Sequence, residues 1–470
     1  MNDQDQHAAG DSSCPLTRQQ QTRNILLFGA NTGMIYLGCA VFYVGITEAA
    51  LCKELGADDK ISNLPGSAYN FGTFLPVFIA WYFPFVRSLR PMVSVGFAMM
   101  ALCGVGMASV LISPVPGWLA VAAVTAYAVL VGVAIQIVAT FQWEILGRGV
   151  PESRRGEAFA WAFGAGPILA VIGSLASQLI LTGTLEVPVV DSSFNVSTQQ
   201  ILKITPLAFP LNYAVLFGAS APIAGMAAIF TMLYVVPKPA VEIERQPFFA
   251  GVFGGLVEFF SYRTIRYAAI ASILIFGANL IMGNVSLYTK QLIGADATQY
   301  VGYQNALRFG FKIFAGFALG WLLTRTSARA GLVATALICL AGVVWASVVP
   351  GKWFMVSFGL LGAGELYGNY YPNYILCCSP PSKMRRNMAL SGMLPMISGP
   401  AAVLFGWISD NYDYVMSFQV AGAIMVLTIL LVLATLPAHP RPRRQDMDAS
   451  DLALAGTVSD EEPRLQRIHI

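Results

Sequence analysis

The sequence predicts an all-α polytopic membrane protein with twelve transmembrane helices in two six-helix halves. Of its 470 residues, 56% are hydrophobic and only 11% are charged, whereas about a quarter of the residues of an ordinary soluble domain are charged. The apolar residues form about twelve long runs, and each can cross a hydrocarbon layer of ~30 Å as a helix. So much apolar sequence cannot form one buried core, because cores stop growing near about 250–300 residues.

The composition excludes several classes of function. The net charge is only +3, with no large basic field, so we expect no nucleic-acid partner. The seven cysteines have no metal-site spacing, and the three histidines, His7, His439 and His469, lie in polar tails. We therefore expect no metal site and no cofactor. Enzymatic activity is not expected either, because no nucleophile–base arrangement is visible. An ATP-driven pump is disfavoured because the chain has no Walker-type phosphate-binding loop.

The expected spans follow one another with short hydrophilic turns between most of them. The first begins at Asn24, after a polar tail that has no apolar core like that of a signal peptide. Pro237 and Pro239 end the sixth, because proline cannot continue a helix. In chain order, the spans are expected at 24–51, 66–86, 92–112, 118–144, 157–182, 210–236, 266–290, 300–324, 330–349, 353–378, 387–409 and 414–436.

The connections define two tails, two halves and a middle loop. The middle loop is apolar and Gly-rich from Phe248 to Tyr262, and this part suits a helix lying at a membrane interface. The connection between the fifth and sixth spans carries the sequon Asn195-Val196-Ser197. In order, the expected parts are an N-terminal tail (1–23), the first half (24–236), the middle loop (237–265), the second half (266–437) and a C-terminal tail (438–470).

The positive charges indicate an orientation. Of the 28 Lys and Arg residues, 21 fall on the connections that share a side with the N-terminus. Because Lys and Arg are enriched on cytoplasmic loops, both termini are expected in the cytoplasm. We expect an integral protein of the plasma membrane that works as a monomer. The opposite side carries only five basic residues: Lys53, Lys60, Lys203, Lys290 and Lys352.

Several features recur in the two halves at nearly one offset, which indicates an internal repeat. A basic connection ends in paired arginines before the fifth span, at Arg155, and again before the eleventh, at Arg386, 231 residues later. A Gly-Pro pair follows each of them, with Pro167 and Pro400 lying 233 residues apart. Three features corresponding in this way, with the basic loops at Arg87 and Arg325, are hard to ascribe to chance.

With this repeat, residues 24–436 resemble the major facilitator superfamily of secondary transporters. The segment Gly320 to Arg329 is similar to the family's second-half loop motif, with Thr324 where the family has aspartate. Gly166-Pro167 is similar to part of the family's fifth-helix motif. The resemblance implies alternating access between two halves. It also implies gating roles for the loop arginines and the Gly-Pro pairs: Arg87, Arg90, Arg325, Arg329, Gly166, Pro167, Gly399 and Pro400.

Charges inside the expected spans mark a candidate site, because each costs at least ~2.5–3.5 kcal/mol at mid-bilayer. Glu48 and Glu144 lie near span ends, so we expect both to reach the interface. Arg308 and Lys312 are four residues apart in the eighth span and therefore share one helix face. Glu365 lies deep in the tenth span, at a depth similar to that of Lys312, so a pair between them is expected. This cluster is either a structural charge pair or a solute or coupling site facing the central cavity.

The tenth span carries a polar stripe around Glu365, made by Asn369 and Asn373 with Tyr370 beside it. Hydroxyl and amide groups among aromatic rings suit a hydrophilic solute with an apolar face. Pro372 makes this helix a candidate for bending, because proline removes an internal hydrogen bond. Further candidates for the cavity wall are Tyr43, Gln136, Asn279, Asn284 and Gln304.

These residues predict a secondary transporter of a small hydrophilic solute, sugar-like or an organic anion. The deep charges sum to +1, which favours an anionic group held by Arg308. Proton coupling through Glu365 is a hypothesis, since its charge state would change the hold of both cations. Two other interpretations stay open: a transporter-like sensor or assembly protein that binds without translocating, and an exporter of drugs or metabolites. We expect the lipid bilayer and the solute as partners, with protons or another ion for coupling.

Overall fold

The computed structural model describes residues 16–83, 85–150, 154, 157–158, 160–190, 196–237, 247–294, 296–379 and 384–441. The expected sequon at Asn195, most of both tails and positions 238–246 of the middle loop lie outside these ranges.

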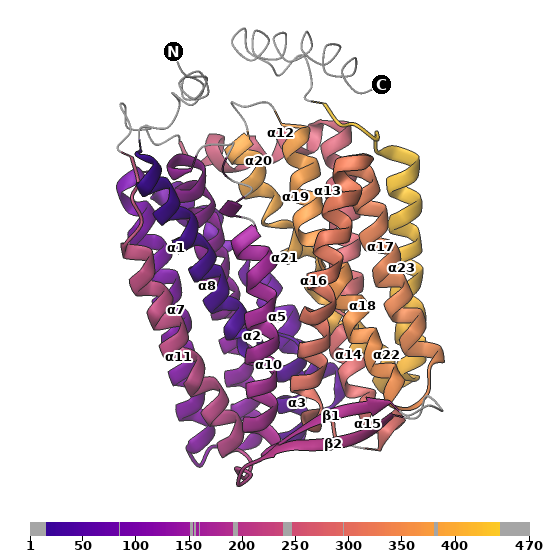
Figure 1. The fold of residues 1–470 in the computed structure, drawn as a ribbon. Helices are drawn as coiled ribbons and strands as arrows, with labels where there is room; N and C mark the ends of the chain where they lie inside the picture. The colour runs from indigo at the N-terminus through magenta and orange to yellow at the C-terminus, as the bar shows by residue number, and fades with distance from the viewer. Residues whose placement is uncertain are drawn as a thin grey trace, which may run out of the picture.

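Helices from the two parts of the chain lie on two sides of the molecule (Figure 1). The helices coloured indigo to magenta form one side, and most of those coloured salmon to yellow form the other. Helix α1 (Arg18–Leu37) begins, and α23 (Tyr414–Thr435) ends, at the same end of the molecule, which we call the terminal end. The two strands lie at the opposite end, which we call the hairpin end.

The first half contains α1 and the short or long helices that follow it. In order, these are α2 (Cys39–Phe42), α3 (Ile46–Glu54), α4 (Asp59–Ser62), α5 (Leu64–Gly72), α6 (Leu75–Tyr82), the 3-10 turn η1 (Val86–Ser88), α7 (Leu89–Ile112), α8 (Gly117–Gly149), the π-helical turn η2 (Ala160–Ala165), α10 (Gly166–Thr182) and α11 (Leu211–Met232).

The middle loop contributes the π-helical turn η3 (Phe249–Gly254) and α12 (Gly255–Ser261), so its expected helix is present. The second half then contains α13 (Arg263–Asn279), α14 (Met282–Leu287), α15 (Thr289–Ile293), η4 (Ala297–Gln299), α16 (Val301–Arg325), α17 (Ala328–Val348), η5 (Gly351–Met355), α18 (Val356–Gly364), α19 (Tyr367–Cys377), α20 (Met384–Ser391), α21 (Leu394–Ser398), α22 (Pro400–Asn411) and α23.

Helices occupy every one of the expected ranges, but not all of them are long and apolar enough to count as spans on their own. Among the described residues, eight helical stretches meet that standard: Val86–Ile112, Gly117–Gly149, Trp161–Thr182, Leu211–Met232, Arg263–Ile293, Ala328–Val348, Arg386–Asn411 and Tyr414–Thr435. The expected first, second and tenth spans are interrupted, near Gly38, Thr73 and Glu365, and the eighth carries buried charges. Twelve membrane crossings therefore stay a prediction.

The connection between α10 and α11 folds into a β-hairpin, which the sequence did not predict. Strands β1 (Thr184–Val190) and β2 (Val196–Lys203) pair antiparallel, with Thr184 opposite Lys203. The Glu186 main-chain N–H donates to the Tyr303 hydroxyl at 2.5 Å. Since Tyr303 lies on α16, the hairpin connects the first half to the second.

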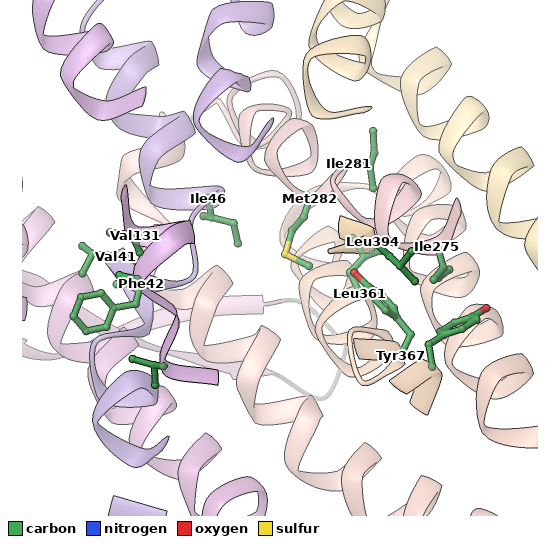
Figure 2. Packing of buried hydrophobic residues seen from close by; sticks show 14 of the residues in the cluster. Val41, Phe42, Ile46, Val131, Ile275, Ile281, Met282, Leu361, Tyr367 and Leu394 are labelled. Carbon is green, nitrogen blue, oxygen red and sulfur yellow. The ribbon is translucent and has the colours of Figure 1, made fainter. Parts of the chain in front are cut away.

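The interior is one large cluster of buried apolar side chains that draws on both halves. Figure 2 shows part of it, with Phe42 and Ile46 from the first half and Met282 and Leu394 from the second. Helix α3, which carries Ile46, packs against α14 and α16.

Hydrogen bonds that join the two halves gather at the hairpin end. The Asp410 carboxylate of α22 accepts from the main-chain N–H groups of Asp59 and Lys60, at 3.0 and 2.8 Å. The Asn63 side chain donates to Asn284 at 2.6 Å. Further bonds of this kind join Thr298 to Glu54 and Tyr213, Gln178 to Gln299 and Gly302, and Val403 to Ser67. The hairpin end is therefore closed.

Candidate functional site

The three deep charges form one buried cluster. Glu365 accepts from Arg308 through Nη2 at 2.5 Å and Nε at 3.1 Å, and from the Lys312 ammonium at 2.6 Å. Arg308 and Lys312 are only 8% and 6% exposed. The pair expected between Lys312 and Glu365 is present, and Arg308 joins it because the two cations share one face of α16.

Glycines set the position of the acid. A Cβ on Gly362 would overlap the backbone and side chain of Arg308, and one on Gly364 would overlap Cys339. Glycine thus lets α18 approach α16 and α17 closely, and Glu365 follows directly where α18 ends. The chain then makes a tight turn through Leu366 before α19 begins. The acid therefore lies at a helix break next to the two cations.

An amide and a thiol complete the second-half side of the cluster. Asn279, the last residue of α13, donates from Nδ2 to Glu365 Oε1 at 3.4 Å. The Cys339 thiol of α17 donates to Asn279 Oδ1 at 3.6 Å. Four segments, α13, α16, α17 and the break after α18, thus meet at Glu365.

Aromatic rings from the first half face the two cations. Tyr36 and Tyr43 stack with centroids 5.7 Å apart, and both contact Phe309 of α16 edge-on. The Arg308 guanidinium lies 5.6 Å, and the Lys312 ammonium 5.7 Å, from the Tyr43 ring centroid. Cations at this distance from a ring are attracted by its negative face. The cluster is therefore in contact with both halves of the chain.

When all three groups are ionised, the cluster carries a surplus positive charge. Glu365 accepts from two cations and one amide, and this arrangement favours its ionised form. One carboxylate beside two cations leaves a net charge of +1 in a buried place, where an uncompensated charge is costly. A carboxylate or phosphate group of a solute would compensate it, and Arg308 can bind such groups with two hydrogen bonds.

The burial of Glu48 was not expected from the sequence. We expected this residue to reach the interface, and this is wrong, because Glu48 is 0% exposed within α3. Its Oε2 accepts from the Gly45 main-chain N–H at 2.8 Å, and its Oε1 has no hydrogen-bond partner among the described residues. By contrast, Glu144 pairs with Arg148 at 2.7 Å as its spacing suggested.

The sequence analysis did not single out two other buried polar residues: Asn305, three residues before Arg308, and Thr47, directly before Glu48. Asn305 is 1% exposed, and within the part of the chain that the structure describes neither of its side-chain polar atoms has a hydrogen-bond partner. The Thr47 hydroxyl, beside Glu48, is also buried without a partner. Asn305 lies roughly 60° around α16 from Arg308, at 100° per residue, so both are on one face. The signal that could have found it is this spacing, three residues before Arg308.

Two predicted wall residues have structural partners elsewhere. Gln304 accepts from Ser286 at 2.6 Å and donates to Thr289 at 3.0 Å, which ties α16 to α14 and α15. Asn284 accepts from Asn63 and donates to the Phe405 carbonyl at 2.8 Å, at the hairpin end. Both contacts lie apart from the charge cluster.

Gln136 of α8 lies against Gly392, which follows α20, so it faces the second half at a different place from the cluster.

The polar stripe expected on the tenth span is split by the helix break. Glu365 belongs to the charge cluster, whereas Asn369 is exposed and Asn373 is half-buried on α19. The Tyr370 ring packs against Gly331 of α17. The expected bend lies at Glu365 and Leu366, and Pro372 lies inside α19. The bend is thus several residues before the proline, where the glycines are.

Three of the four predicted gating arginines, Arg87, Arg90 and Arg329, make contacts within their own halves. Arg90 donates to the Tyr234 carbonyl at 3.2 Å, just after α11, and Arg329 donates to the Leu436 carbonyl at 3.0 Å, just after α23. The two bonds occupy corresponding places in the two halves. Arg87 lies 4.9 Å from the Phe85 ring centroid, and Arg325 is an exposed residue at the end of α16.

Both Gly-Pro pairs stand at helix junctions. Gly166 and Pro167 begin α10 directly after the π-helical turn η2, and Gly399 and Pro400 lie where α21 passes into α22. A Cβ on Gly166 would overlap the Tyr36 ring of the aromatic wall. Gly166 and Pro167 therefore lie between the Tyr36 ring and the π-helical turn η2.

Within the described residues, no group of His, Cys, Asp and Glu side chains is arranged to hold a metal ion.

The sequence matches no protein-family model and no curated protein. Solved structures, however, share its fold. A nucleoside transporter superposes with a TM-score of 0.63 at 11% identity, covering 88% of this chain and 100% of its own. A D-xylose–proton symporter gives 0.58 at 14% identity, with 90% and 97% covered. FucP, an E. coli fucose–proton symporter and major facilitator superfamily transporter, gives 0.58 at 14% identity in its outward conformation, with 88% and 100% covered.

Proposed function

We propose that this chain, which has the fold of major facilitator superfamily transporters, is a secondary active transporter of a small hydrophilic solute. The observation that carries the proposal is the buried Arg308–Glu365–Lys312 cluster, which lies in contact with aromatic rings of the opposite half. The structures that share the fold include proton symporters of D-xylose and fucose, which supports the class.

The solute is either sugar-like or an organic anion. The cations would hold a carboxylate or hydroxyl groups, the Tyr43 ring would cover an apolar face, and Asn279 would accept or donate a hydrogen bond. Asn305 adds an amide whose hydrogen-bonding capacity is unused. An unpaired buried amide calls for a partner, and a bound solute would supply one.

Solute movement would follow alternating access, in which the two halves rock around the site. Closure of the hairpin end by hydrogen bonds of Asp410, Asn63 and Thr298 supports this, because these bonds join the two halves at one end of the molecule. The gating arginines Arg90 and Arg329 hold each half together as a rigid unit. In this proposal the chain crosses the plasma membrane twelve times, keeps both termini in the cytoplasm and acts as a monomer.

The coupling ion in this proposal is a proton, and Glu48 holds it. A carboxyl group that is buried with one main-chain partner and no cation in hydrogen-bond contact favours its neutral form. Glu365 is less suited, because two cations stabilise its ionised form. When Glu48 releases its proton, its negative charge offsets the surplus positive charge of the cluster, so proton and anion occupancy are linked.

Thermal-shift screening of the purified protein against sugars, sugar acids, other organic anions and nucleosides tests the site at pH 6 and pH 8. A bound solute raises the unfolding midpoint, because a ligand that binds only the native state stabilises it. We expect at least one solute to stabilise the wild type and not Arg308→Leu, whereas Arg266→Leu, at the exposed start of α13, responds like the wild type. A stabilising solute that acts equally on Arg308→Leu contradicts the proposed site.

A further inference from the structure

A groove at the terminal end combines positive charge with an apolar wall. It has a volume of about 780 Å³ and is lined by the start of α1 and by Leu233, directly after α11. The lining residues are Arg18, Gln19, Thr22, Arg23, Leu26, Leu27 and Leu233.

The lining changes along the helix from charged to apolar. Arg18 and Arg23 lie in the first two turns of α1, and Leu26 and Leu27 lie one turn deeper. From Arg18 to Leu26 is roughly 12 Å at 1.5 Å per residue. Leu26 and Leu233 are 50% and 44% exposed. The arginines lie outermost, where the headgroup of a phospholipid would lie, and the exposed leucines lie deeper, where its acyl chains would lie.

The groove is held in shape by a buried asparagine. Asn24 is 0% exposed, and its Nδ2 donates to the carbonyls of Gly149 at 3.3 Å and Val235 at 2.8 Å. Its Oδ1 accepts from the Val235 N–H at 2.9 Å. These bonds fix α1 to the ends of α8 and α11. These bonds therefore fix the position of the arginines on α1 relative to Leu233 on the other wall of the groove.

The position of the groove favours a lipid over a soluble anion. Helix α11 is long and apolar enough to span a membrane and ends at Met232, so Leu233 marks the edge of the apolar layer. A basic groove between helices at that edge suits an anionic lipid headgroup, and the leucines provide the surface for its chains. A soluble phosphate would gain nothing from the leucines.

We propose that this groove binds one anionic phospholipid, with the phosphate group held by Arg18 and Arg23 and an acyl chain lying along Leu26, Leu27 and Leu233. The proposal is independent of the transported solute. It assigns a ligand to residues that the proposed transport site does not use.

The test is native mass spectrometry of the full-length protein with dioleoylphosphatidylglycerol or dioleoylphosphatidylcholine. We expect one phosphatidylglycerol to be retained in preference to phosphatidylcholine. Arg18→Ala with Arg23→Ala should weaken its retention about 25-fold, since each arginine near a membrane surface contributes a factor of about five. Leu26→Gln should weaken it without any change of charge.

Arg263→Ala with Arg266→Ala is the matched control, because it removes two exposed arginines at the start of α13, at the same end of the molecule. This variant should keep the bound lipid. Equal retention of the two lipids, an equal loss in the control, or full displacement by glycerol 3-phosphate would each overturn the proposal. So would binding that begins only after residues 1–15 are removed, because the tail would then be the occupant.

Discussion

At the scale of single residues, the proposed site depends on four charged or chargeable side chains in the interior. Arg308, Lys312 and Glu365 form the cluster, and Glu48 is buried apart from it with one oxygen unpaired. Removing one partner of a buried ion pair costs about 3–5 kcal/mol, because it leaves an uncompensated charge. The consequence of a substitution here depends on which charge it leaves behind.

Glu365→Gln should destabilise the protein more than Lys312→Met. The first change leaves two buried cations next to each other, whereas the second leaves the Arg308–Glu365 pair with no net charge. We expect a loss of about 3–5 kcal/mol for Glu365→Gln and clearly less for Lys312→Met. Unfolding midpoints of the purified variants in one detergent give the comparison. A larger loss for Lys312→Met would show that the surplus charge is already compensated.

Glu48→Gln should uncouple transport from the proton gradient. The amide imitates the protonated acid and cannot release a proton, so solute exchange should persist while pH-driven accumulation is lost. Proteoliposomes loaded with the stabilising solute allow both to be measured. Glu144→Gln, which changes an acid paired with Arg148 on α8, is the control and should accumulate solute like the wild type. Full accumulation by Glu48→Gln excludes Glu48 as the proton carrier.

At the scale of elements, close helix approach brings the site together. Helix α18 can lie close against α16 because Gly362 has no side chain at the contact with Arg308. A bulkier residue there would move the helix that ends at Glu365.

Gly362→Ala should therefore destabilise the protein by about 1–3 kcal/mol, the usual cost of overpacking a well-filled interface. Gly310→Ala and Gly316→Ala, on α16 itself, are the controls, because a Cβ at either position meets no neighbouring atom. These two should be neutral or stabilising, since alanine favours a helix by up to about 1 kcal/mol over glycine. The unfolding midpoints of the three variants test this. Equal midpoints would show that close approach at Gly362 is not required.

Asp410→Ala should loosen the closed hairpin end. It removes two charge-assisted hydrogen bonds from α22 to the start of α4, each worth about 1.5–3 kcal/mol. Asp413→Ala is the matched control, because Asp413 caps α23 within the same half. Spin labels at Ile61 and Tyr412, with native cysteines replaced by alanine, report the separation of the halves. We expect a longer distance in Asp410→Ala only; an unchanged distribution would contradict the closing role.

At the scale of the whole molecule, the sequence predicted the class well because apolar run length and charge placement are local signals. The pair between Lys312 and Glu365 was also predictable, since depth along two helices can be counted from the spacing. Burial of Glu48 was not, because it depends on how α3 packs against α14 and α16 after the breaks at Gly38 and Gly45. The β-hairpin was not predicted, because Pro188 interrupts the valine-rich run of β1 and argues against a strand.

The sequence also did not show which polar residues bond two helices together and which have unused hydrogen-bonding capacity. Gln304 and Asn284 have the composition of cavity residues, yet their partners, Ser286 and Asn63, come from other elements. Asn305 has no such partner, although it is next to Gln304 in the sequence. Only the packing of the helices separates a residue that ties two helices together from one that is left open for a ligand.

In the proposed function, the two halves move a solute past the Arg308–Glu365–Lys312 cluster. This is tested most directly by uptake of the stabilising solute into proteoliposomes under an inwardly directed proton gradient, with the outside more acidic than the inside. We predict accumulation above the external concentration by the wild type, collapse of the gradient of solute on addition of a protonophore, and no uptake by Arg308→Leu. Tight binding of the solute without any uptake or exchange would contradict the account and identify a sensor instead.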